Sequence, residues 1–213
     1  MEKYKVFAKI QDGVSLNEFK DFSDDKDVVM VAVAKKPHNL RFASDRLKDD
    51  EDVVLLAISK DGMCIQYASP RLKMKKDIAI IAIDNVESIH YFGKCMTPLE
   101  YLPEEICDDK DVVIEAVKQS YMALKFASDR LKDDDEVVEI ARSNFKKQLV
   151  YASERFQYNP KYIYFWLATE LKNINCSHDL VNIITKALTE LAELKGWSKN
   201  EEEGKKLLKK LEK

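Results

Sequence analysis

The sequence FASDRLKDD occupies Phe42–Asp50 and occurs again, unchanged, at Phe126–Asp134. A second identical stretch, DDKDVV, precedes each copy, at Asp24–Val29 and at Asp108–Val113. Both pairs are separated by 84 positions. Two long identities at one offset indicate a tandem repeat, and a repeat decides the architecture before any single residue is interpreted.

The repeat unit is 25 residues long. A pair of mostly β-branched residues recurs with steps of 25, 25, 34, 25 and 25 positions, at Val28-Val29, Val53-Val54, Ile78-Ala79, Val112-Val113, Val137-Val138 and Tyr162-Ile163. The long step equals one unit plus nine residues, which predicts an insertion near 94–102. The chain therefore contains six units, arranged as two blocks of three.

Each unit is predicted to form two short helices. In the first, Val28, Val29, Ala32 and Val33 share one face of a helix with 3.6 residues per turn. Residues suited to capping a helix N-terminus mostly precede it, at Asp25, Asp50, Lys75, Asp109, Asp134 and Asn159, and Pro160 fits the first helical position. The second helix carries Leu40, Ala43 and Leu47 at spacings of three and four, and Gly62 suits a left-handed residue that closes the preceding helix.

Helices of about ten residues are marginal alone in water, so a single pair must pack against its neighbours. The sequence therefore predicts an all-α protein, a right-handed α-solenoid of short helix pairs with atypical capping segments at both ends. One domain is expected over 1–213: an N-terminal cap (1–23), a first block (24–107), a second block (108–176), a capping helix (177–196) and a charged tail (197–213).

The N-terminal cap leaves two alternatives. Tyr4, Val6, Ala8 and Ile10 alternate with mostly polar residues, which allows a strand, but a short helix fits as well. Gly13 ends this element. Ser15 and Glu18 have the spacing of a capping box, which predicts a helix continuing to about Phe22.

Composition excludes several classes of protein. The net charge is −3 and the pI about 5.8, which does not suit a globally basic nucleic-acid binder. The four cysteines form no C-x-x-C pair, and His38, His90 and His178 have no metal-like spacing, so we expect neither a metal nor a cofactor. The start lacks the apolar core of a signal peptide and no run is long enough to span a membrane, so we expect a cytoplasmic protein, in the producing cell or in a host.

The unit, D-K-D-V-V-x-x-A-V followed by L-x-F/Y-A-S-x-x-L-K-x-D, resembles the tandem helical repeat catalogued as domain of unknown function 4116. Residues 25–50, 50–73 and 109–134 match it best, and the third and sixth units match poorly. The resemblance spans about 24–174. It implies an all-helical array with a binding role, and it implies no catalytic residues.

The candidate partner-binding residues form two groups. A ladder of arginines recurs at Arg46, Arg71, Arg130 and Arg155, where stacking would align the guanidinium groups to hold phosphates or carboxylates. The alternative is that each arginine pairs with an acid that opens a nearby helix, such as Asp52 or Glu136. Aromatic residues that suit a partner's hot spot form the second group, Tyr162, Tyr164 and Trp166, together with Tyr101 at the insertion.

Function is predicted as non-enzymatic. No phosphate-binding loop, metal spacing or catalytic triad is visible, and Ser44, Ser69, Ser128 and Ser153 recur without a histidine base. We expect a helical-repeat scaffold that binds a protein partner, as a small phage- or pathogen-encoded effector or inhibitor. The alternative is binding of nucleic acid or another anionic ligand along the arginines. The sequence indicates no oligomeric state.

Overall fold

The computed structural model describes residues 2–86, 90–91, 94–144 and 150–157. The chain divides into two compact units, Met1–Ala141 and Arg142–Lys213. The predicted sixth repeat, the capping helix 177–196 and the tail 197–213 lie outside the described residues, as do Asn159 and Pro160. The single-domain division therefore stays a prediction.

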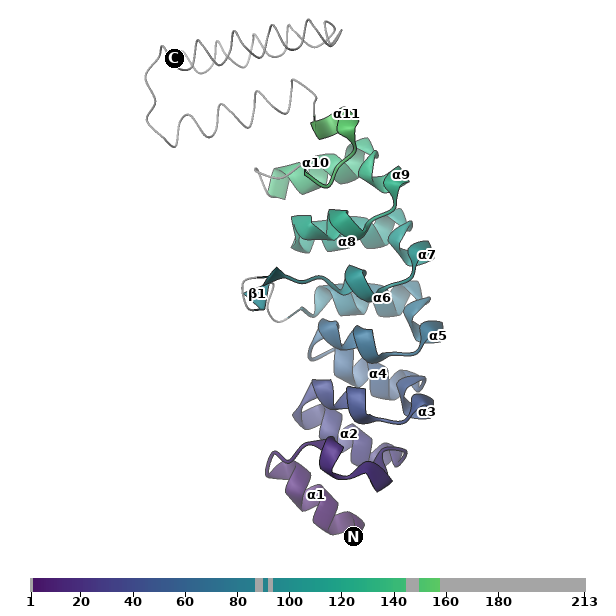
Figure 1. The fold of residues 1–213 in the computed structure, drawn as a ribbon, viewed down its shortest axis with the longest axis vertical. Helices are drawn as coiled ribbons and strands as arrows, with labels where there is room; N and C mark the ends of the chain where they lie inside the picture. The colour runs from purple at the N-terminus through teal and green to yellow at the C-terminus, as the bar shows by residue number, and fades with distance from the viewer. Residues whose placement is uncertain (1, 87–89, 92–93, 145–149, 158–213) are drawn as a thin grey trace, which may run out of the picture. The chain divides into compact units, whose positions relative to one another are not determined.

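The first unit is a stack of α-helices that follow one another in a row (Figure 1). The row begins with α1 (Lys3–Gln11), α2 (Lys26–Lys35), α4 (Glu51–Ile58), α6 (Lys76–Asp84) and α8 (Lys110–Gln119), and each packs on the next. The helix α10 (Asp135–Asn144) crosses the boundary between the two units. An all-α solenoid is confirmed, and its right-handed sense stays a prediction.

The 25-residue register is confirmed by burial. The recurring pairs face the core in every described repeat and are fully buried: Val28-Val29, Val53-Val54, Ile78-Ala79, Val112-Val113 and Val137-Val138. The predicted caps are also in place, since the carboxylates of Asp25, Asp50, Asp109 and Asp134 accept hydrogen bonds from the first free N–H groups of their helices. Lys75 occupies the equivalent position but makes no side-chain cap.

The second predicted helix of each repeat is wrong in form. It is a 3₁₀-helix followed by two extended residues and a four-residue α-helix: η3 (Pro37–Phe42) with α3 (Asp45–Lys48), η4 (Gly62–Tyr67) with α5 (Pro70–Lys73), η5 (Pro98–Tyr101) with α7 (Glu104–Cys107), and η6 (Tyr121–Phe126) with α9 (Asp129–Lys132). The 3₁₀-helices form a second row that packs against the α-helices, and the core lies between the rows. The helix α11 (Glu154–Gln157) is the matching short helix of the second unit.

The extended residues that separate each 3₁₀-helix from the short α-helix have a clear cause. The N–H of Ser69 donates to the carbonyl of Lys48 in the preceding repeat, and the Ser69 side chain caps α5. A continuous helix would need that N–H for its own ladder. Ser44 bonds in the same way to Ser23, and Ser128 to Cys107. The observed role of Ser44, Ser69 and Ser128 is therefore this hydrogen bonding between consecutive repeats.

The N-terminal cap is helical. The helix α1 settles the choice between strand and helix, and Gly13 ends it with a φ of 93°. The helix predicted from Ser15 to Phe22 is wrong, because the chain forms two 3₁₀-turns there, η1 (Leu16–Glu18) and η2 (Lys20–Phe22). They are separated by Phe19, whose φ of −123° and ψ of 53° are not helical.

The insertion lies earlier than predicted. A short hairpin, β1 (His90–Tyr91) with β2 (Lys94–Cys95), precedes η5 and projects from the stack on the side opposite α3, α5 and α7 (Figure 1). The interval 94–102 therefore includes η5, a regular part of the third repeat, with Leu99 buried. Because α6 packs directly on α8, the extra residues leave the row of helices continuous.

Candidate functional site

The predicted arginine ladder follows the edge of the stack formed by the short helices. In the second repeat, Arg71 Nε donates to Asp49 Oδ1 at 2.9 Å, and Arg71 Nη2 donates to the backbone carbonyl of Asp49 at 2.7 Å. The Ser69 hydroxyl donates to the same carboxylate. The same arrangement joins Arg46 and Ser44 to Asp24, and Arg130 and Ser128 to Asp108.

These contacts leave three of the four arginines charge-compensated. The Ser69 hydroxyl, and after it the Arg71 guanidinium, lower the pKa of Asp49, so the carboxylate stays ionised. A phosphate would therefore meet an ion pair whose charge is already compensated, and not a free cation. The interpretation of the ladder as ion pairs holds for Arg46, Arg71 and Arg130, although the partners are the residues just before the caps and not Asp52 or Glu136.

Arg155, the fourth member of the ladder, lies in α11 of the second unit, and its guanidinium carbon is 4.4 Å from the centroid of the Phe156 ring. Tyr162, Tyr164 and Trp166 lie outside the described residues. Tyr101 ends η5 and is half-buried, and burial, followed by the charge of Glu100, raises its pKa. It occupies the same place in its repeat as Phe42, Tyr67 and Phe126, so its position reflects the repeat and not the insertion.

A second set of charges joins consecutive repeats. Lys26, the first residue of α2, contacts both Asp50 and Asp52 of the next repeat at 2.8 Å. Equivalent ion pairs connect Lys3 to Asp25 and Asp27, Lys76 to Asp109 and Asp111, and Lys110 to Asp134 and Glu136. Between the second and third repeats the charges are exchanged, since Glu51 begins α4 and its carboxylate lies 2.5 Å from Lys75 Nζ.

The ion pairs between consecutive repeats predict that the fold loses stability in acid. Burial raises the pKa of Asp50, but hydrogen bonds from Lys26 and from the N–H groups of Val53 and Asp52 outweigh it and lower the pKa below 3.8. The pKa values of Asp25, Asp109 and Asp134 are also lowered. A carboxyl group with a lowered pKa in the folded state stabilises the fold above its unfolded pKa, and this contribution is lost as the pH falls through the folded pKa.

We therefore expect the urea midpoint of unfolding to fall as the pH is lowered from about 5 towards 2. The variant Asp50→Asn keeps an acceptor for the cap but cannot titrate, so it should show a shallower fall than the wild type. A wild-type urea midpoint that stays constant across this pH range would show that the ion pairs between repeats do not stabilise the fold.

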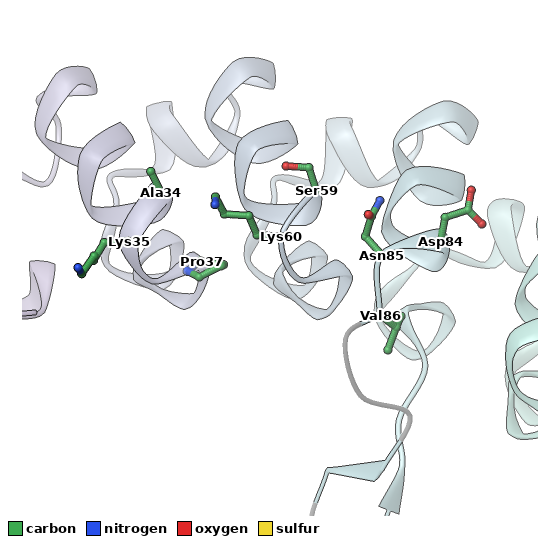
Figure 2. Close-up of a pocket in the computed structure, with 8 residues that line it drawn as sticks. All are labelled: Ala34, Lys35, Pro37, Ser59, Lys60, Asp84, Asn85 and Val86. Carbon is green, nitrogen blue, oxygen red and sulfur yellow. The ribbon is translucent and has the colours of Figure 1, made fainter.

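The structure also contains a groove at the opposite ends of the α-helices. It has a volume of about 710 Å³ and is lined by Ala34, Lys35, Pro37, Ser59, Lys60, Asp84, Asn85 and Val86. Figure 2 shows these residues along the C-terminal ends of α2, α4 and α6, so the groove crosses three successive repeats. Its lining combines short side chains with two lysines and one aspartate, and Ala34, Ser59 and Lys60 are exposed.

Gly62, two residues after the lining residue Lys60, joins the second repeat to the third. Gly62 N–H donates to the carbonyl of Asn85 at 2.7 Å and so ties η4 to the end of α6. A Cβ atom at Gly62 would lie 1.7 Å from the carbonyl oxygen of Ala82. Gly62 is not in the left-handed conformation predicted for it, and close approach of two backbones is what requires glycine there.

Three potential metal ligands meet where the first repeat contacts the second. Among the described residues, His38, Asp61 and Cys64 bring one ligand atom each to within 4.8 Å of one another. His38 Nε2 is 2.8 Å from Asp61 Oδ2, and His38 Nδ1 is 3.3 Å from the Tyr67 hydroxyl. The expectation of no metal site rested on sequence spacing alone, and the fold brings Asp61 and Cys64 to His38.

The Cys64 thiol is not poised as a nucleophile. It is fully buried, and burial, followed by the charge of Asp61, raises its pKa to about 12. A reactive cysteine needs a lowered pKa and access to its substrate.

Comparison of the repeats with one another does not single out this cluster. The residues that occupy the position of His38 in the next repeat and in the fourth repeat are Met63 and Met122. The third and fifth repeats have Thr97 and Lys147 there, so polar residues are common at this position, and only the fold brings His38 to Asp61 and Cys64.

In the described residues, no helix is long and apolar enough to cross a membrane.

Comparison with known proteins agrees with the repeat architecture. No curated protein and no solved structure matches the chain. One family model matches four overlapping segments, 25–73, 50–106, 95–132 and 109–157, which together cover more than half of the sequence. The chain therefore belongs to the family described as domain of unknown function DUF4116, of which it carries tandem copies.

Proposed function

We propose that this chain is a non-catalytic scaffold that binds an extended segment of a partner protein along the groove at the ends of α2, α4 and α6. The observation that carries the proposal is that the groove crosses three repeats, because each repeat contributes the same helix end. Stacked repeats commonly bind partners along such continuous surfaces.

The lining supports a peptide as the occupant. Ser59 Oγ donates to the carbonyl of Leu56 and can accept a hydrogen bond from a partner, and Asn85 can both donate and accept. Lys35 and Lys60 can pair with acidic side chains, and Asp84 can pair with a basic one. The last carbonyl groups of a helix are not all used within the helix, so helix ends also offer acceptors to a partner's N–H groups. Mixed charge of this kind favours a peptide over a uniformly anionic ligand.

The edge that carries the ladder arginines supports nucleic-acid binding less than the groove supports peptide binding. Asp24, Asp49 and Asp108 already compensate the charge of three of the four ladder arginines. Among the described residues, the buried free thiols Cys64 and Cys107 support a reducing compartment such as the cytoplasm, and the proposal places the chain there.

The test is selection of peptides from a displayed random library on the full chain, followed by affinity measurements on two matched variants. Ser59→Trp fills the groove and should weaken binding by about tenfold or more, since it removes the space that a partner side chain would occupy. Asp45→Trp places the same bulk on the exposed edge at α3 and should leave the affinity unchanged.

Two results would overturn the proposal. One is that no peptide binds saturably; the other is that Ser59→Trp binds the selected peptides as well as Asp45→Trp does. Titration with single-stranded RNA and DNA at low and high salt completes the experiment. Binding that weakens steeply with salt would assign the chain to the anionic-ligand alternative instead.

A further inference from the structure

The contact between the first and second repeats has the arrangement of a metal site. His38 comes from η3, whereas Asp61 caps η4 and Cys64 lies within η4. The side chains of His38 and Asp61 are 44% and 16% exposed, and Cys64 is fully buried beneath them. An ion could therefore enter from the solvent side through His38 and Asp61 and reach the thiol at the base.

The outer contacts hold the ligands in the orientation that metal binding needs. His38 directs Nε2 towards Asp61, and its other ring nitrogen faces the Tyr67 hydroxyl at 3.3 Å. The second carboxylate oxygen of Asp61, Oδ1, accepts the N–H of Met63 at 2.9 Å. Metal-binding histidines usually donate their other N–H to such a partner, and metal-binding carboxylates are themselves hydrogen-bonded.

The chemistry and spacing of the three ligand atoms limit which metal ions can bind. Tetrahedral zinc bonds of about 2.0 Å to nitrogen and oxygen and about 2.3 Å to sulfur separate the ligand atoms by roughly 3.3–3.7 Å. The three atoms here lie within 4.8 Å of one another, with His38 Nε2 and Asp61 Oδ2 at 2.8 Å, so small side-chain rotations would give that geometry. Sulfur and imidazole ligands favour zinc and similar transition metals over magnesium or calcium.

We propose that His38, Asp61 and Cys64 bind a single zinc-like transition-metal ion that links η3 to η4. Three protein ligands leave a fourth position for water or for an acidic group of a partner. The ion would replace the direct hydrogen bond between His38 and Asp61 by bonds of both residues to one centre, and the Cys64 thiol would release its proton to solvent as the metal–sulfur bond forms. It would thereby strengthen the contact between two repeats that also line the groove.

The experiment is titration of the full reduced chain with Co²⁺, whose thiolate charge-transfer absorption in the near ultraviolet reports a cobalt–sulfur bond. We expect saturation at one ion per chain and displacement by Zn²⁺. The variants Cys64→Ser and His38→Gln should each weaken binding by about tenfold or more, and Cys64→Ser should remove the charge-transfer band. Cys107→Ser is the matched control, because Cys107 is also buried but lies outside the cluster, and it should leave the band intact.

Far-ultraviolet circular dichroism checks that each variant is folded. His38 is partly exposed, so His38→Gln keeps the test valid if Cys64→Ser does not fold. At the same concentration, zinc should raise the melting temperature of the wild type more than that of His38→Gln. The proposal is overturned if the wild type gives no charge-transfer band, or if the band persists in Cys64→Ser and His38→Gln.

Discussion

Replacing Gly62 with alanine is expected to lower the free energy of unfolding by about 3 kcal/mol or more. The added Cβ would lie 1.7 Å from the carbonyl oxygen and 2.7 Å from the carbonyl carbon of Ala82. Both atoms belong to the backbone of α6, so the clash cannot be relieved by rotating a side chain. Either α6 or η4 must move, which breaks the hydrogen bond from Gly62 to Asn85.

Chemical denaturation of the wild type and of Gly62→Ala measures this loss. Ser59→Ala is the matched control, because Ser59 is an exposed residue on the same side of the stack and its substitution should change stability by less than about 0.5–1 kcal/mol. If Gly62→Ala were as stable as Ser59→Ala, the two backbones would not approach as closely as the structure places them.

The second large effect is expected at Asn39, a buried polar residue with 4% exposure. Its Oδ1 accepts hydrogen bonds from the Ser15 hydroxyl at 3.0 Å and from the N–H of Leu16 at 3.2 Å. Its Nδ2 donates to the carbonyl of Ala32 at 2.9 Å. One amide group thus joins the N-terminal cap, the end of α2 and η3.

The variant Asn39→Ala should lower the free energy of unfolding by about 2–3 kcal/mol, because it leaves the buried N–H of Leu16 without its acceptor. Hydrogen exchange should become faster at Leu16 in particular. Asn17→Ala is the control, since Asn17 is exposed in the same segment and should have little effect. Unchanged exchange at Leu16 in Asn39→Ala would contradict the role given to the amide.

The charged residues between repeats also specify which repeats pack together. Most contacts place a lysine at the start of one helix against an aspartate cap on the next, as Lys26 does with Asp50. The contact of Glu51 with Lys75 exchanges the two charges. A stack shifted by one repeat would bring like charges together at this contact, which disfavours the wrong arrangement.

Much of this architecture follows from the sequence alone. The identity of Phe42–Asp50 with Phe126–Asp134 gives the repeat, and the valine pairs give its register. The cap at Asp25 can be recognised because an N-terminal cap is a local interaction with N–H groups two and three residues away. The buried face of α2 can be recognised for a similar reason, since helical periodicity relates residues within about two turns.

Tertiary contacts decided the rest. Ser69 interrupts a predicted helix because its N–H bonds to Lys48 in the previous repeat, and Gly62 is required because Ala82 of the following repeat approaches it. The cluster of His38 with Asp61 and Cys64 likewise forms only when one repeat packs on another. Each of these contacts joins residues about 20 or more positions apart, where local periodicity carries no information about distance, so the stacking of the repeats had to be known first.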